Sequence, residues 1–244
     1  MKKEASSPPL LTLPDLTEGF FLSRPNRFTV RVRINGDDHS AHLHDPGRLT
    51  ELLTEGNRLL LRPAEKDGRK TAWDIIAAFR SGCWVIINSA LHRPLGEAFL
   101  QGEESPLGPL RSLKPEISAP HGRLDFYAET LSGGLWIETK GCTLFEGARA
   151  LFPDAPTRRG TRHLRELISL RERGERAALL IFIFSVSVSL FAPHRERDPD
   201  FARAFYDALD GGVDIYPLSF HFDGTHVRYH GLLPIEPDQR KESP

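Results

Sequence analysis

Two acids and a lysine in the middle of the chain have a spacing that suits metal-dependent chemistry. Asp125 is followed, after a gap of twelve residues, by Glu138, and Lys140 stands two residues further on. The residues around them predict two strands, 123–128 and 135–139, joined by a tight turn. Two carboxylates on adjoining strands repel each other unless they share a cation, and a hard divalent ion such as Mg²⁺ or Mn²⁺ suits them. The pattern therefore predicts a metal site at one end of a sheet.

Lys140 and Glu116 extend this candidate site. Residues two apart on a strand point to the same face, so Lys140 can position a water or stabilise negative charge on a phosphate beside Glu138. Glu116 lies nine residues before Asp125 on a further predicted strand, 114–118, and offers a third carboxylate. We expect Glu116, Asp125 and Glu138 to hold the metal. We expect Lys140 to act with Asp125 and Glu138 in catalysis. The alternative is an exposed strand edge, where an acid beside a lysine serves only solubility.

Arginine clusters supply local positive charge on a chain that is nearly neutral overall. With 32 basic and 33 acidic residues the net charge is −1, which excludes a protein whose whole surface is basic. Seven arginines and three glutamates fall between residues 156 and 176. Thr157 is a good N-cap for a helix running to about residue 173. Arg158, Arg162 and Arg165 recur at helical spacing and predict a basic stripe, or else the solvated face of an ordinary amphipathic helix.

A second group of basic residues stands near the start of the chain. Three arginines lie close in the sequence to three phenylalanines: Arg24, Arg27, Arg48, Phe20, Phe21 and Phe28. Arginines beside aromatic rings suit a single strand of nucleic acid, because rings stack on bases. The alternative is a barrel whose aromatic residues belong to the core. His42 and His44 share a strand face, but a zinc site would need further ligands that the sequence does not place nearby.

The elements that must position these residues form two regions. Short strand patterns at close spacing predict a small β-barrel over residues 15–86. From residue 87 to 233, helices alternate with strands, which predicts an α/β or α+β domain. Its helices are expected at 89–100, 157–173 and 199–209, its buried strand at 177–184, and its closing strands at 213–220 and 226–231.

Two classes of protein are excluded by the distribution of apolar residues and cysteines. The longest dense apolar run, residues 177–184, is far shorter than the roughly 20 residues of a membrane span. The first residues have no apolar core of a secretory signal, so we expect a cytoplasmic protein. Cys83 and Cys142 stand far apart without a CxxC partner, which supports neither a disulfide framework nor a cysteine-type zinc site.

Five segments carry a resemblance that covers residues 15 to 231. They are SRPNRF at 23–28, AHLHDPGRL at 41–49, GRLDF at 122–126, IETKGCTL at 137–144 and FPDAPTRRGTRHL at 152–164. With them the sequence resembles the sugar fermentation stimulation protein A family. The resemblance implies an α+β protein: an N-terminal OB-like β-barrel followed by a domain similar to the PD-(D/E)XK nucleases. It also implies DNA as a partner, bound without sequence specificity, and a role in regulating the use of sugars such as maltose.

The resemblance also assigns residues to the expected site. It places Glu116, Asp125, Glu138 and Lys140 in a nuclease-like signature that uses Mg²⁺ or Mn²⁺. The residues expected to contact DNA come from both regions: Arg24, Arg27, Arg48, Arg123, Arg158, Arg159, Arg162 and His163.

Several positions depart from the pattern usual in the family. Phe184, Ser185 and Ser187 stand where Gln, Arg and Asp are usual, and Asp45 and Gly122 replace the usual Asn and Ser. Two functions therefore stay open, a DNA-binding protein that cleaves and a DNA-binding regulator that keeps only the fold. A third possible function is a metalloenzyme that acts on a phosphorylated sugar. This function does not account for two separate arginine clusters, so it is less favoured.

Overall fold

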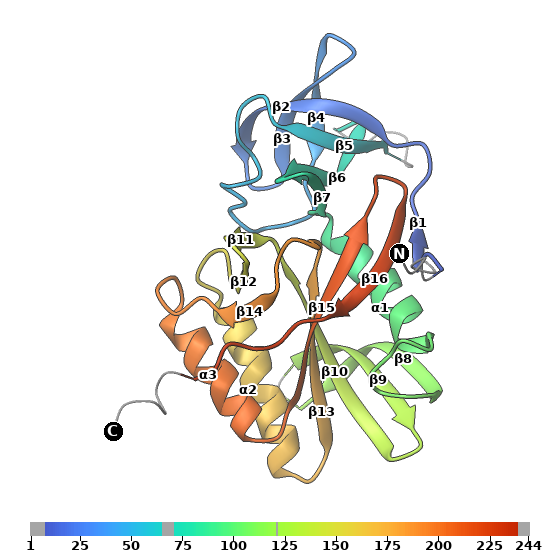
Figure 1. Ribbon diagram of the computed structural model, residues 1–244, viewed down its shortest axis with the longest axis vertical. Coiled ribbons are helices and arrows are strands. Elements are labelled where there is room, and N and C mark those ends of the chain that lie inside the picture. Colours follow the sequence, from blue (N-terminus) through green and yellow to red (C-terminus); the bar gives the residue numbers. More distant parts are fainter. Residues whose placement is uncertain (1–7, 65–70, 121, 239–244) are drawn as a thin grey trace, which may run out of the picture.

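The computed structural model describes residues 8–64, 71–120 and 122–238, and its first half is a β-barrel (Figure 1). The barrel strands are β2 (Thr17–Asn26), β3 (Thr29–Ile34), β4 (Asp37–His42), β5 (Arg58–Pro63), β6 (Trp73–Arg80) and β7 (Cys83–Ile86). They hydrogen-bond in the order β4-β3-β2-β5-β6-β7, and β4 also pairs with β6. This last pairing joins β2 to β6 into a closed five-stranded barrel, as the sequence predicted.

The barrel follows from strict alternation along its strands. In β3, Val30, Val32 and Ile34 are buried, whereas Arg31 between them is exposed. The hairpin from β3 to β4 turns at Asn35 and Gly36, whose φ angles are 52° and 94°. Both residue types tolerate positive φ, which a two-residue turn matching the twist of the strands requires.

The second half is built on a mixed seven-stranded sheet with the order β1-β16-β15-β13-β10-β9-β8. Its strands are β1 (Leu11–Thr12), β8 (Leu110–Ala119), β9 (Gly122–Thr130), β10 (Gly133–Cys142), β13 (Arg176–Ile183), β15 (Asp214–Phe222) and β16 (His226–Leu232). β10, β13 and β15 are parallel to one another, and the remaining pairs are antiparallel. A small sheet of β11 (Leu144–Glu146), β12 (Arg149–Phe152) and β14 (Leu190–Pro193) lies beside it.

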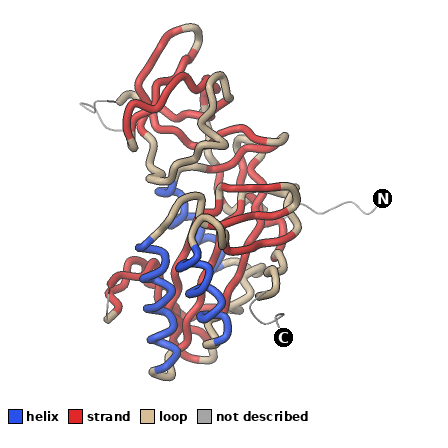
Figure 2. The backbone as a smooth tube through the Cα atoms, turned by 90° about the vertical axis from the view of Figure 1, so that its left-hand side faces the viewer, coloured by secondary structure: helices blue, strands red, loops and turns tan. Residues whose placement is uncertain are grey.

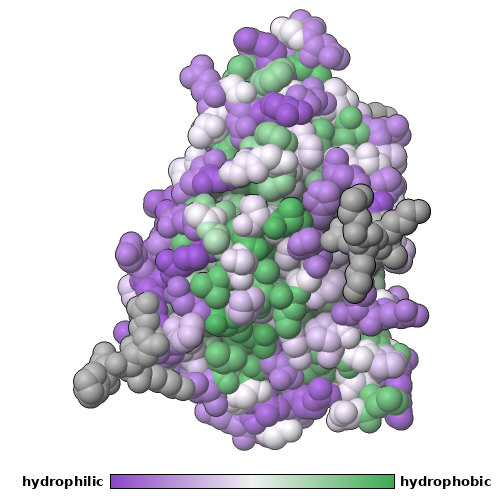
Figure 3. All heavy atoms as spheres, in the orientation of Figure 1, coloured by the Kyte–Doolittle hydropathy of each residue, from purple (hydrophilic) through white to green (hydrophobic). Residues whose placement is uncertain are grey.

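Helices cover both faces of the seven-stranded sheet (Figure 2). α2 (Arg158–Glu172) and α3 (Pro199–Asp210) pack side by side on one face. A short 3-10 turn, η1 (Ser89–Leu91), leads into α1 (His92–Gln101), which packs on the other face with Gly96 against Phe126 and Phe182. Hydrophobic residues gather near the middle of the face seen in Figure 3, over this sheet, and hydrophilic residues dominate its margins.

Most predicted elements of this half are confirmed, with differences at their ends. The three helices begin within a few residues of the predicted positions. β8, β9 and β10 are longer than predicted at both ends. In β8 the added residues include the exposed Arg111 and Ser112, and β10 begins with Gly133 and Gly134, which are not typical of strands. β1 pairs with β16, so residues ahead of the barrel complete the sheet of the second half. No helix in the described ranges is long and apolar enough to cross a membrane.

Candidate functional site

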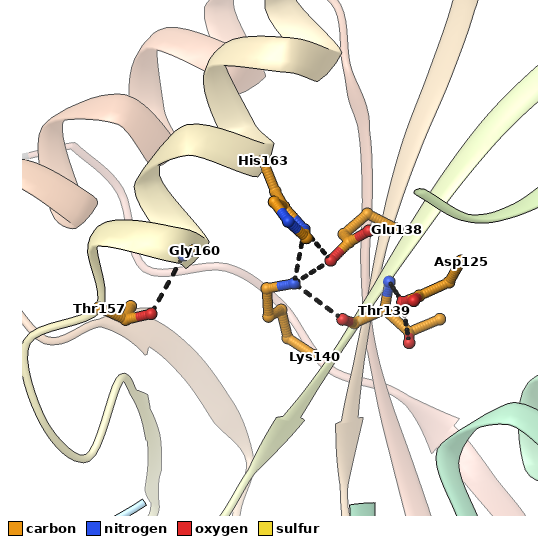
Figure 4. Close-up of polar contacts among 7 residues, drawn as sticks. All are labelled: Asp125, Glu138, Thr139, Lys140, Thr157, Gly160 and His163. Atoms are coloured by element: carbon orange, nitrogen blue, oxygen red, sulfur yellow. Dashed lines mark hydrogen bonds and ion pairs between the residues drawn. The ribbon is translucent and has the colours of Figure 1, made fainter. Parts of the chain in front are cut away.

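Asp125 and Glu138 lie side by side on β9 and β10. The antiparallel register pairs Ile137 with Phe126, so Glu138, which follows Ile137, and Asp125, which precedes Phe126, come together on the face covered by α2 (Figure 4). The backbone N–H and the hydroxyl of Thr139 both donate to Asp125 Oδ2, at 2.8 and 2.5 Å. These bonds fix one oxygen of the Asp125 carboxylate and leave the other available for a ligand.

Glu138 is the most deeply buried acid of this group, with 2% of its surface exposed. Its Oε1 atom accepts a hydrogen bond from Lys140 Nζ on the same strand and contacts His163 Nδ1 of α2. Lys140 Nζ also donates to the Thr139 carbonyl at 3.1 Å. The buried Oε2 atom of Glu138 has no hydrogen-bond partner in the described part of the chain. Since buried polar atoms are almost always satisfied, this oxygen is suited to a ligand that the chain itself does not supply.

The surroundings shift the pKa values of the two acids in opposite directions. Burial alone would raise the pKa of Glu138, but the charge of Lys140 and the hydrogen bond from His163 outweigh it and lower that pKa. Burial and the neighbouring Glu138 charge raise the pKa of Asp125, against the attraction of Lys140 and the bonds from Thr139. Glu138 is therefore held ionised, and Asp125 gains most from a cation that relieves the repulsion.

The acids and the lysine line one cleft of about 380 Å³ between the two halves of the chain. Its wall also includes Arg93, Arg159 and His92. No cluster of three or more acid, histidine or cysteine side chains with the arrangement of a metal site occurs among residues 8–64, 71–120 and 122–238. Two carboxylates with one unsatisfied buried oxygen fit a hard cation that keeps several of its waters, as Mg²⁺ does.

Glu116 lines the same cleft, but its carboxylate is engaged elsewhere. Arg93 donates to its Oε1 at 3.2 Å and Arg123 to its Oε2 at 3.0 Å, and all three side chains are exposed. The φ angle of Glu116 is 51°, which costs energy for a residue with a side chain. This backbone conformation interrupts the pairing of β8 opposite Asp125. Glu116 would have to leave both arginines to join Asp125 and Glu138.

The residues expected to contact DNA have different surroundings. Arg159 lines the acidic cleft, and Arg27 and Arg48 line an adjoining groove of about 510 Å³. Arg158, Arg162 and Arg165 line another pocket, which also includes Asp198 and Asp200 at the start of α3. Arg27, Arg48 and all of these α2 arginines are exposed and available to phosphates.

Three other residues of that set have protein partners in the structure. Arg24 donates to the carbonyls of Arg27, Gly47 and Arg48 at 2.7 to 2.8 Å, so it holds the loop after β4 in place. Arg123 pairs with Glu116. His163 is 6% exposed and contacts Glu138 from the helix side.

His92 is a cleft residue that the sequence did not single out. Its ring lies over Gly141, where an added Cβ would meet His92 Cε1 at 2.4 Å. Burial, and then the charge of Lys140, lower the pKa of His92 to about 4, so the ring is neutral at pH 7. In the sequence, His92 stands at an ordinary helix start. The signal that relates to its position is Gly141, where a residue without a side chain leaves room for a ring.

Three of the positions that depart from the family pattern, Phe184, Ser185 and Ser187, follow the end of β13. Phe184 is buried, and its ring is stacked on His92 with ring centroids 6.5 Å apart. Ser185 is 2% exposed, and its hydroxyl contacts that of Ser187 at 2.9 Å. An apolar ring and two short hydroxyl side chains thus follow β13, and of these Phe184 contacts the cleft residue His92.

Comparisons with known proteins agree along nearly the whole chain. The SfsA N-terminal OB domain matches residues 22–87, and the Sugar fermentation stimulation protein RE domain matches residues 90–226. A Sugar fermentation stimulation protein homolog from Methanococcoides burtonii is 41% identical over 233 residues, which cover 93% of this chain and 94% of that protein. Another from Methanothermobacter thermautotrophicus is 40% identical over 84% of this chain and 86% of its own length. The structure of Pyrococcus furiosus SfsA in complex with Ca²⁺ superposes with a TM-score of 0.86 and 31% identity, covering 95% of this chain and 100% of that one.

Proposed function

This chain belongs to the sugar fermentation stimulation protein family, and on that premise we propose that it is a DNA-binding protein with a nuclease-like site that uses a divalent cation. The observation that carries this proposal is the buried, unpartnered Oε2 atom of Glu138, beside Asp125 and Lys140 in one cleft. The Pyrococcus furiosus protein forms a complex with Ca²⁺, which supports a cation site here because Ca²⁺ and Mg²⁺ both take oxygen ligands. The names of the relatives support a regulatory role in sugar metabolism for the DNA-binding activity.

Each residue of the cleft has a separate role in the proposed phosphodiester cleavage. Asp125 and Glu138 would hold the cation, which when bound lowers the pKa of a water and withdraws charge from a phosphate oxygen. Lys140 presents its ammonium at the floor of the cleft, where it can donate a hydrogen bond to the attacking water or to the phosphate. His163 holds the Glu138 carboxylate in place from α2. Arg159 on the wall attracts the phosphate backbone.

A cleavage assay with a matched lysine control tests the catalytic part. Lys140→Ala should reduce metal-dependent cleavage about 100-fold or more, because it removes a donor aimed at developing charge. The Kd of this variant for DNA should stay within a few-fold of the wild-type value, because only one contact among many is lost. Lys114, an exposed lysine on β8, provides the control Lys114→Ala. Labelled single-stranded and double-stranded DNA are incubated with Mg²⁺, Mn²⁺ or EDTA, and binding and cleavage are scored separately.

The second candidate function is a DNA-binding regulator that does not cleave. Phe184, Ser185 and Ser187 favour it, because they put no charged group at the end of β13 beside the cleft. If the wild type binds DNA but cleaves no form of it with either cation, the catalytic proposal is dropped and this second function stands. If the wild type binds no DNA at low salt, both are wrong.

A further inference from the structure

An exposed stack of aromatic rings lies at one end of the barrel. The Phe28 side chain, just before β3, is 48% exposed to solvent. Its ring is stacked on that of His42, with centroids 6.3 Å apart and an angle of 28° between the planes. The His42 and His44 rings meet edge to face, with centroids 4.4 Å apart. We call Phe28, His42 and His44 the ring platform. His42 lies against the Phe28 ring, and nearly half of the Phe28 side chain is open to solvent.

The loop after β4 connects the ring platform to the acidic cleft. The carbonyl of His44 accepts a 3.0 Å hydrogen bond from the Ser89 hydroxyl, and Ser89 lines the cleft with Asp45, the residue after His44. His44 of the ring platform and Asp45 of the cleft are neighbours in the chain, so the rings and the cleft adjoin each other at this loop.

Positive charge accompanies the rings along this path. Arg27 precedes Phe28 in the chain. Arg27 and Arg48 both line the groove that adjoins the cleft. This groove and the cleft share Asp45, Pro46, Gly141 and Thr157, so the two are continuous. Both guanidinium groups are exposed and suit the phosphates of a strand whose bases turn toward the rings. Rings with arginines alongside form the arrangement that binds unpaired strands.

We infer that the cleft receives an unpaired strand of DNA, with a base stacked on Phe28 of the ring platform. The inference rests on the proposed function and narrows its substrate class to single strands and to duplexes with an unpaired end. The physical reason is that both faces of a base inside a duplex are covered by its neighbours. Only an unpaired base can offer a face to a protein ring.

Binding measurements with two phenylalanine variants test this inference. Phe28→Ala should weaken the Kd for a labelled single strand by about fivefold or more, the lower end of the effect of losing one stacked base. The Kd for a blunt duplex should stay nearly unchanged, and Phe28→Trp should restore binding of the single strand. The matched control is Phe20→Ala. The sequence groups Phe20 with Phe28, but the structure separates them: Phe20 is 45% exposed and pairs with Arg33, about 16 Å along β3 from Phe28, so it lies outside the ring platform. It should bind both DNA forms like the wild type.

The outcomes separate this inference from the proposed function. If the wild type binds DNA but Phe28→Ala has no effect, or weakens single strand and blunt duplex equally, the inference is wrong and the proposed function stands. An equal loss in Phe20→Ala also overturns it, because the effect then belongs to any exposed ring of the barrel. A wild type that binds neither form overturns both. Fluorescence anisotropy in EDTA measures all of these without any requirement for cleavage.

Discussion

Replacing Asp45 by asparagine should make this protein more stable at neutral pH. Asp45 lies on the loop after β4, where its Oδ1 accepts a 2.7 Å hydrogen bond from the Gly47 N–H. Burial is the largest cause that raises the pKa of its carboxyl, from 3.8 to about 6. The nearby Asp154 carboxylate raises this pKa further, against the effects of Gly47 and Arg24. The ionised form of Asp45 is therefore the one that destabilises the folded state.

The sign of the pH dependence follows from proton linkage. The folded protein binds this proton more tightly than the unfolded chain, so the free energy of unfolding falls as pH rises from about 4 to about 6. Above that range the loss is complete and constant. The rise of this pKa from 3.8 to about 6 lowers the free energy of unfolding at neutral pH by at most about 3 kcal/mol. Because Asp45 is only partly buried at a groove, screening by water places the expected effect between about 1 kcal/mol and this maximum of about 3 kcal/mol.

Urea unfolding of the wild type and Asp45→Asn in EDTA, between about pH 4 and pH 8, measures this effect. Asparagine keeps an acceptor for Gly47 and removes only the charge. The variant should match the wild type at the acid end and be about 1 to 3 kcal/mol more stable at the neutral end. Asp37→Asn, at the exposed start of β4, is the control and should show no difference. A gain that is absent at neutral pH, or equal at every pH, would refute the reasoning.

Three further predictions concern the cation, the DNA and the cleft wall. Mg²⁺ or Mn²⁺ should raise the Tm of the wild type by binding the folded state, and Asp125→Asn should remove most of that rise; equal shifts at matched cation concentration contradict the site. DNA affinity should fall steeply with salt, and Arg158→Ala combined with Arg162→Ala should lower the slope of log Kd against log salt by about one for each arginine. An unchanged slope in a salt titration counts against these contacts. Gly141→Ala should cost about 1 to 3 kcal/mol of stability, because the new Cβ meets the His92 ring; an unchanged urea midpoint would show that the ring moves aside freely.

The sequence alone determined the order and type of most elements, because their signals lie in adjacent residues. Thr157 is the N-cap of α2, and its hydroxyl accepts the Gly160 N–H at 3.1 Å as the local pattern predicts. The alternation in β3 and the apolar run of β13 likewise depend only on which side chains must be buried. The closing pair β4–β6 and the pairing of β1 with β16 join distant segments, and no local pattern specifies such a pairing.

For the site, the sequence determined that Asp125, Glu138 and Lys140 would meet, because a tight turn sets the register of two neighbouring strands. Only the tertiary structure decided what surrounds them. The packing of α2 on the sheet directs His163 onto Glu138, and the packing of α1 places His92 over Gly141. Periodicity shows which face of a helix is apolar, but the charged group that meets a given acid depends on how helix and sheet pack against each other. That packing is set by contacts between residues far apart in the chain.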